Sequence, residues 1–189
     1  MINRFSDWLR AVSSGWVTLA ALLIFVLFSA LVLPGQSTAA DEVAGNAGSP
    51  DMSFFYTPDD LYRMAEAYGE TGRRGYVRAR FTFDLIWPVV YTLFLVTAIS
   101  CAFGRAFAPD SRWQRANLLP VLGAVFDYVE NISTSVVMLR YPEPTALLDL
   151  LAPVATGLKW LSLGVSFLLL AAGITIAIWR WGQQRRRLS

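Results

Sequence analysis

Three long runs of the chain contain no charged residue, and a fourth is apolar apart from a short polar segment. The uncharged runs are Val17–Leu33, Leu85–Phe103 and Trp160–Trp179, and the fourth is Leu118–Leu139. Each run approaches the roughly 20 residues that a helix needs to cross the hydrocarbon core of a membrane. The pattern therefore predicts an all-α membrane protein with four transmembrane helices in a bundle. It excludes a porin-type barrel, whose strands are shorter and alternate between apolar and polar residues.

A polar stretch separates the first two runs and contains one further predicted helix. Residues 34–50 are small and polar, which is typical of a loop or flexible linker. Thr57 then suits a helix N-cap and Pro58 the first helical position, with two acids in the first turn. One helical face is apolar, at Leu61, Met64, Ala65 and Tyr68. We therefore predict a short amphipathic helix over residues 58–69, ended by Gly69, on the membrane surface, on the bundle or in solvent.

The segments between the runs set the boundaries of the predicted organisation. Pro142 and Pro144 end the third span, and Pro153 is expected to break any helix that starts near Thr145. Six of the seven tryptophans lie at or beyond the ends of the runs, as in the aromatic belts of membrane proteins. The predicted segments are 1–15 (cytoplasmic), 16–34 (first span), 35–80 (extracytoplasmic loop), 81–104 (second span), 105–117 (cytoplasmic loop), 118–139 (third span), 140–157 (extracytoplasmic loop), 158–181 (fourth span) and 182–189 (basic cytoplasmic tail).

The distribution of basic residues predicts the orientation. With both termini inside, nine basic residues are cytoplasmic: Arg4, Arg10, Arg105, Arg112, Arg115, Arg180, Arg185, Arg186 and Arg187. Seven are outside: Arg63, Arg73, Arg74, Arg78, Arg80, Arg140 and Lys159. Long loops cross membranes with little regard to charge, so the arginines of the long first loop count less toward the orientation. The arginines just before residue 81 nevertheless oppose this orientation. The dominance of arginine over lysine is typical of a GC-rich bacterial genome. We therefore predict a multi-pass protein of a bacterial inner (plasma) membrane, with both termini in the cytoplasm.

The N-terminal region has two interpretations. Residues 1–39 carry a basic start, an apolar run and small residues before Ala40, as a cleaved signal peptide would. The run Val17–Leu33 is longer than the roughly 7–15 apolar residues of a signal peptide. A retained first span is therefore the expectation, and cleavage stays open as the alternative.

Composition excludes several chemistries. The apolar fraction is 55% and the charged fraction 16%, against about 25% charged in soluble domains, which excludes a soluble globular enzyme. The chain has no histidine and one cysteine, so we expect no metal site, no cofactor and no His-dependent catalysis. A net charge of +2 is too small to indicate nucleic acid as a partner. The expected partners are the lipid bilayer and, by association, the protein itself or other membrane subunits.

Ionisable groups inside the predicted spans are the candidate functional residues, because they are costly in lipid and usually face a bundle interior. Asp127, Glu130 and Asn131 lie at i, i+3 and i+4, on one face of the third span. With the predicted topology, Asp84 and Lys159 are shallow in the outer half of the membrane, so all four charged groups can meet in one cluster that opens outward. The candidate binding site is the polar intramembrane cluster Asp84, Tyr91, Asp127, Glu130, Asn131 and Lys159.

Two functions are compatible with such a cluster. It can hold helices in register in a binding, accessory or structural membrane subunit, or it can serve a small proton-coupled transporter or carrier, in which the only lysine, Lys159, exchanges protons. We favour the first, because the chain shows neither an inverted repeat nor a pair of discontinuous helices. Asp84 and Asp127 also raise the hypothesis of an intramembrane aspartyl protease, but their flanking residues lack the Tyr-Asp and Gly-x-Gly-Asp signatures of that family. No catalytic residue is therefore expected, and the ligand is not identified.

Overall fold

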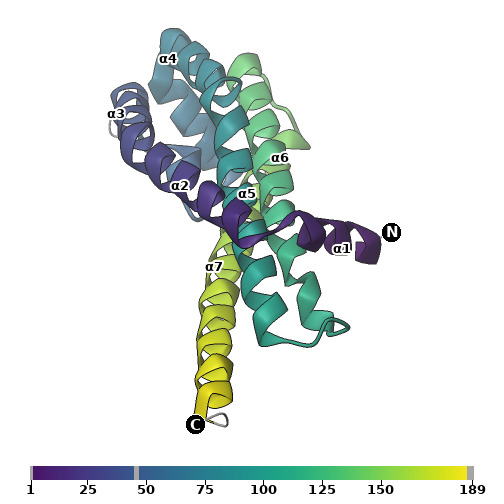
Figure 1. The fold of residues 1–189 in the computed structure, drawn as a ribbon. Coiled ribbons are helices and arrows are strands. Elements are labelled where there is room, and N and C mark those ends of the chain that lie inside the picture. Colours follow the sequence, from purple (N-terminus) through teal and green to yellow (C-terminus); the bar gives the residue numbers. More distant parts are fainter. Residues whose placement is uncertain (1, 45–46, 187–189) are drawn as a thin grey trace. The chain divides into compact units, whose positions relative to one another are not determined.

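The computed structural model of the chain describes residues 2–44 and 47–186, and this part of the protein contains helices and no strand. The predicted all-α fold is therefore confirmed. Figure 1 shows the helices in chain order. They are α1 (Ile2–Val12), α2 (Gly15–Leu31), α3 (Leu33–Ala44), the 3-10 helix η2 (Pro50–Met52), α4 (Pro58–Arg80), α5 (Phe83–Ala106), the 3-10 helix η3 (Arg112–Leu118), α6 (Leu119–Arg140) and α7 (Leu148–Arg186).

Two helical stretches of the described chain are long and apolar enough to cross a membrane. They are Pro58–Ala106, whose apolar part is α5, and Leu148–Arg186, which is α7. The helices α1 and α2 are bent by 87° relative to each other and would add a third span if the bent pair counts as one. The sequence also predicts a span over residues 118–139, which correspond to α6, but α6 is not among these stretches. The four-span arrangement therefore stays a prediction.

The segment predicted as a loop over residues 34–50 is partly helical. Its first part belongs to α3, which packs against α4. Pro34 is the second residue of α3, where the missing N–H group of proline costs no intrahelical hydrogen bond. The alanines that follow favour a helix, which explains why a polar and small composition does not give an irregular linker here.

The start of α4 agrees with the sequence prediction, and its end lies further along the chain. The Thr57 hydroxyl accepts a hydrogen bond from the Asp60 N–H at 3.2 Å, and the Asp60 carboxylate accepts one from the Thr57 N–H at 2.8 Å, so the two residues form a capping box. Gly69, the predicted end, has φ 61° and ψ −178° and kinks the helix. The chain then continues as a helix to Arg80.

The last helix is longer than predicted at both ends. It begins at Leu148, not at residue 158, and Pro153 lies inside it without breaking it. Pro153 is the sixth residue of α7, so its missing N–H removes one intrahelical hydrogen bond, the one to the Asp149 carbonyl. The basic segment predicted as a tail continues the helix as far as Arg186.

The described residues form two compact units. The first consists of residues 2–25, 90–122 and 162–186. In it, α1 packs against η3, where the Ser6 hydroxyl donates to the Asn117 side chain at 2.8 Å and the Asn117 amide donates to Ser100 at 3.1 Å. The Gln114 amide donates to the Phe103 carbonyl at 3.2 Å, near the end of α5. Neutral side chains therefore form hydrogen bonds among α1, α5 and η3 in this unit.

The second unit consists of residues 26–44, 47–89 and 123–161. Its hydrophobic core lies where α4 packs on the end of α6 and the start of α7. Its buried members are Tyr56, Leu61, Met64, Ala65, Tyr68, Tyr76, Val137, Met138 and Ala152. The apolar face predicted for residues 58–69 thus contributes Leu61, Met64, Ala65 and Tyr68 to this core, and it does not face solvent.

Candidate functional site

Five of the six predicted site residues lie in the second unit, and all five are buried. Their exposed fractions are 7% for Asp84, 6% for Asp127, 0% for Glu130, 3% for Asn131 and 5% for Lys159. The sixth, Tyr91, is also buried but belongs to the first unit. The cluster described below for the second unit therefore does not include Tyr91.

The helix α6 supplies a polar face, as its sequence spacing predicts. The Asn131 amide group donates to the Asp127 carboxylate one turn earlier at 3.3 Å. Thr134 is also buried, and its hydroxyl donates to the Glu130 backbone carbonyl at 2.9 Å. The Tyr76 hydroxyl of α4 in turn donates to Thr134 at 3.1 Å. Hydrogen bonds along and between helices thus fix the orientation of this face.

Lys159 connects α7 to α6. Its ammonium group forms an ion pair with the Glu130 carboxylate, and both side chains are almost completely buried. The same ammonium group lies 4.0 Å from Asp51 of η2 and 5.3 Å from the centre of the Trp160 ring. Lys159 and Glu130, two of the charged groups expected to meet in one cluster, are therefore in contact in the structure.

Two residues of the cluster were not predicted from the sequence: Asp51 and Arg80. The Arg80 Nε atom lies 2.8 Å from Asp84 Oδ2, and the Arg80 guanidinium also forms an ion pair with Asp51. Its charge is 4.6 Å from the centre of the Tyr76 ring. Arg80 is 7% exposed, although it belongs to the segment predicted as an extracytoplasmic loop. The spacing of Arg80 and Asp84 at i and i+4 is a sequence signal for this pair, but no comparable signal marks Asp51.

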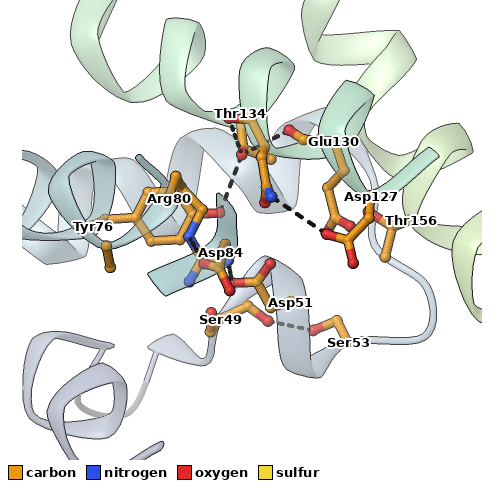
Figure 2. A network of polar contacts seen from close by, with 12 residues as sticks. Ser49, Asp51, Ser53, Tyr76, Arg80, Asp84, Asp127, Glu130, Thr134 and Thr156 are labelled. Atoms are coloured by element: carbon orange, nitrogen blue, oxygen red, sulfur yellow. Dashed lines mark hydrogen bonds and ion pairs between the residues drawn. The ribbon is translucent and has the colours of Figure 1, made fainter. Parts of the chain in front are cut away.

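These contacts define what we call the polar cluster, and Figure 2 shows most of it: Arg80 and Tyr76 lie on one side, Asp127, Glu130 and Thr156 on the other, and Asp51 and Asp84 between them. Its members come from η2, α4, α5, α6 and α7. They are Asp51, Arg80, Asp84, Asp127, Glu130, Asn131 and Lys159.

The polar cluster contains more acids than bases. Four carboxylates, those of Asp51, Asp84, Asp127 and Glu130, face two cations, Arg80 and Lys159. Two buried oxygens of the cluster, Glu130 Oε1 and Asn131 Oδ1, have neither a hydrogen-bond partner nor an ion-pair partner. Uncompensated charge and unpaired acceptors are costly in a protein interior, so the arrangement favours protons or other hydrogen-bond donors.

Tyr56 borders the cluster and stays a neutral phenol. It is buried and accepts a hydrogen bond from the Thr156 hydroxyl at 3.1 Å. Burial, followed by the negative charge of Glu130, raises the pKa of Tyr56 above its ordinary value. Tyr56 therefore supplies hydrogen bonding and packing here and not a negative charge.

No group of three or more His, Cys, Asp or Glu side chains in residues 2–44 and 47–186 is arranged so that it could hold one metal ion. Comparisons of the chain with protein families, with curated proteins and with solved structures find no match. The polar cluster and the apolar helices are therefore the features of the described chain that bear on its function.

Proposed function

We propose that the protein is a small integral membrane protein with four spans, and that it acts as a binding, accessory or structural membrane subunit. In this proposal the polar cluster lies in the outer half of the bilayer and joins the extracytoplasmic segment before α5 to the spanning helices. The observation that carries the proposal is the position of Asp51, whose carboxylate reaches from η2 to Arg80 and approaches Lys159.

The ion pairs support a connecting role because their partners come from different elements. Asp51 links η2 to the end of α4 and to α7, and Glu130 links α6 to α7. A buried ion pair adds little net stability compared with an apolar pair, but removing one partner strands the other charge at a cost of about 3–5 kcal/mol. Such pairs therefore specify which segments come together more than they strengthen the fold.

The exposure of the cluster supports an outward-facing site. The Asp51 side chain is 20% exposed, whereas those of Glu130 and Lys159 are 0% and 6% exposed. Asp51 belongs to the segment that the sequence assigns to the extracytoplasmic side. The most accessible charge of the cluster is thus the one that faces the outside in the proposed topology.

A small proton-coupled carrier is the second candidate, and the excess of carboxylates favours it. Four carboxylates with two cations can take up protons, and Glu130 retains an unpaired buried oxygen. Lysine is also a basic residue that can lose its proton when buried, which arginine does not. A carrier would use these groups to load and release protons across the membrane.

One experiment separates the two candidates. The purified protein is reconstituted in liposomes that contain a pH-sensitive dye, and proton entry is measured under an imposed membrane potential. We expect the wild-type protein to give the same proton entry as empty liposomes, while Asp51→Asn lowers the thermal midpoint in detergent. The control Asp59→Asn changes an exposed acid in the first turn of α4 and should lower the midpoint far less, because it removes only a small helix-dipole contribution.

Two results would contradict the proposed connecting role. Proton entry that exceeds that of empty liposomes and disappears in Glu130→Gln would establish the carrier. Equal midpoints for Asp51→Asn and Asp59→Asn would show that Asp51 does not hold its segment on the helices.

A further inference from the structure

The segment after Asp51 carries large apolar side chains that are mostly exposed. Met52, Phe54 and Phe55 are 66%, 72% and 82% exposed. All three lie outside the predicted spans, in a segment where the sequence assigns an extracytoplasmic loop. Exposed apolar groups of this size that lie together mark a surface that contacts a partner or a membrane.

The same segment is fixed on its other side. Ser49 and Pro50 are buried, and the Ser53 hydroxyl donates to the Ser49 carbonyl at 3.0 Å, which closes the turn of η2. Asp51 forms its ion pair with Arg80. Tyr56 is buried, and its hydroxyl accepts a hydrogen bond from Thr156 of α7. Residues 52–55 therefore form a short tip whose two ends are attached to the second unit.

An aromatic contact relates this tip to an apolar helix. The ring of Phe54 lies 5.0 Å, centre to centre, from the ring of Trp160. Trp160 is the first residue of the uncharged run Trp160–Trp179 in α7, one of the stretches that are apolar enough to cross a membrane. Tryptophan at the end of such a run is typical of the membrane–water interface. Phe54 therefore lies at the level of α7 where the headgroups are expected.

We propose that residues 52–55 are an aromatic anchor that inserts into the headgroup region of the outer leaflet. This inference rests on the proposed membrane function, and its partner is the lipid surface beside α7. The charged side of the segment, Asp51, faces the polar cluster, and the apolar side, with Phe55 at its most exposed point, faces lipid. Insertion of the anchor would keep the Asp51 carboxylate on Arg80 and Lys159.

Spin labelling in bilayers tests the anchor directly. The single native cysteine is first removed by Cys101→Ser, and one nitroxide is then attached through Phe55→Cys. Matched labels are placed through Asp59→Cys, an exposed polar position of α4, and through Leu168→Cys, an exposed position (70%) in the apolar run of α7. Each protein is reconstituted in phosphatidylcholine–phosphatidylglycerol vesicles, and collisions with oxygen and with a water-soluble nickel chelate are measured.

We expect the label at position 55 to collide more with oxygen than with the nickel chelate, as the label at position 168 does, and the label at position 59 to show the reverse. The same measurement with Met52→Cys provides a second position on the anchor if the first variant does not fold. If positions 55 and 52 are as accessible to nickel as position 59 while position 168 is in lipid, the anchor is disproved and the membrane assignment stands. If position 168 is also accessible to nickel, the membrane proposal itself fails.

Another copy of the chain could cover these aromatic residues in place of lipid. Spin–spin broadening at position 55 that disappears when labelled protein is diluted with unlabelled protein would show such a contact between copies. That result would also overturn the lipid anchor.

Discussion

At the scale of single residues, Lys159 and Glu130 form the buried ion pair between α7 and α6. The Lys159 side chain is 6% exposed, and its ammonium group pairs with Glu130 of α6 and lies 4.0 Å from Asp51. Loss of this cation would leave the buried Glu130 carboxylate without its charge partner, whereas Asp51 would keep Arg80. Loss of the Glu130 charge would leave Lys159 near Asp51. The two halves of this ion pair are therefore not equivalent.

We expect Lys159→Met to destabilise the protein by about 3–5 kcal/mol, because it strands a buried carboxylate. Glu130→Gln should cost less, because the remaining cation keeps a carboxylate nearby. The measurement is the thermal midpoint in detergent of both single variants and of the double variant. The double variant should be more stable than the sum of the two single effects predicts, since the second substitution removes the stranded charge.

Additive effects of the two substitutions would show that these side chains do not interact. Glu143→Gln serves as the control, because Glu143 is an exposed acid that follows α6 and pairs only with exposed Arg140 in the contacts described here. Its midpoint should equal that of the wild-type protein within the small range typical of surface pairs.

Helical spacing predicts the members of the polar cluster that share a helix, and it fails for the others. Asp127, Glu130 and Asn131 follow from the 3.6-residue period of one helix, which places them on one face whatever that helix packs against. Asp51 lies on a short turn, so its reach to Arg80 depends on the tertiary path of the chain, which no local pattern encodes. Tyr91 lies on the predicted second span together with Asp84, but in the structure it belongs to the first unit.

At the scale of elements, α4 begins with a capping box and contains a kink at Gly69. Gly69 has φ 61° and ψ −178°, a conformation that is essentially confined to glycine. A Cβ atom added there would meet nothing within 4 Å, so any cost of a side chain is due to the backbone alone. Gly157 in α7 has the same open surroundings without a positive φ, and it offers a matched control.

We expect Gly69→Ala to destabilise the protein by about 1–3 kcal/mol through backbone strain. Gly157→Ala should instead be neutral or stabilise by about 0.5–1 kcal/mol, because alanine restricts the unfolded chain and favours the helix. Thermal midpoints of the two variants in detergent check this difference in sign. A Gly69→Ala variant as stable as Gly157→Ala would mean that the kink relaxes into a continuous helix at no cost.

Several helix boundaries could be predicted from local signals, and others could not. The capping box of Thr57 and Asp60 is encoded within four residues, so the start of α4 follows from the sequence. The predicted helix break at Pro153 is wrong. A proline in the second turn costs one hydrogen bond, and the other hydrogen bonds of the 39-residue helix outweigh this loss. The helix α3 was missed because small polar residues occur in both linkers and helices, and here its packing on α4 decides between them.

At the scale of the whole molecule, the number of helices that cross the membrane depends on α6. The helices α5 and α7 contain runs of about 20 uncharged residues, which is enough to span. The helix α6 has a suitable length of 22 residues but carries Asp127 and Glu130 in its middle. Both acids are buried in the second unit, and Glu130 is paired with Lys159, so their cost in lipid is lower than hydropathy alone indicates.

If α6 crosses the membrane, Asp110 and Pro144 lie on opposite sides, and the four-span arrangement then predicts both termini in the cytoplasm. The sequence supports this orientation through nine basic residues inside against seven outside, with a cluster of arginines directly after the last span. Fusions of a reporter that is active only outside the cytoplasm, placed after Asp110, Pro144 and Ser189, measure the three positions. We expect activity after Pro144 and none after Asp110 or Ser189. Equal activity after Asp110 and Pro144 would show that α6 does not span. The acids of α6 would then not need a helix bundle to shield them from lipid. Activity after Ser189 with none after Pro144 would invert the topology and place Asp51 and the aromatic anchor on the cytoplasmic side.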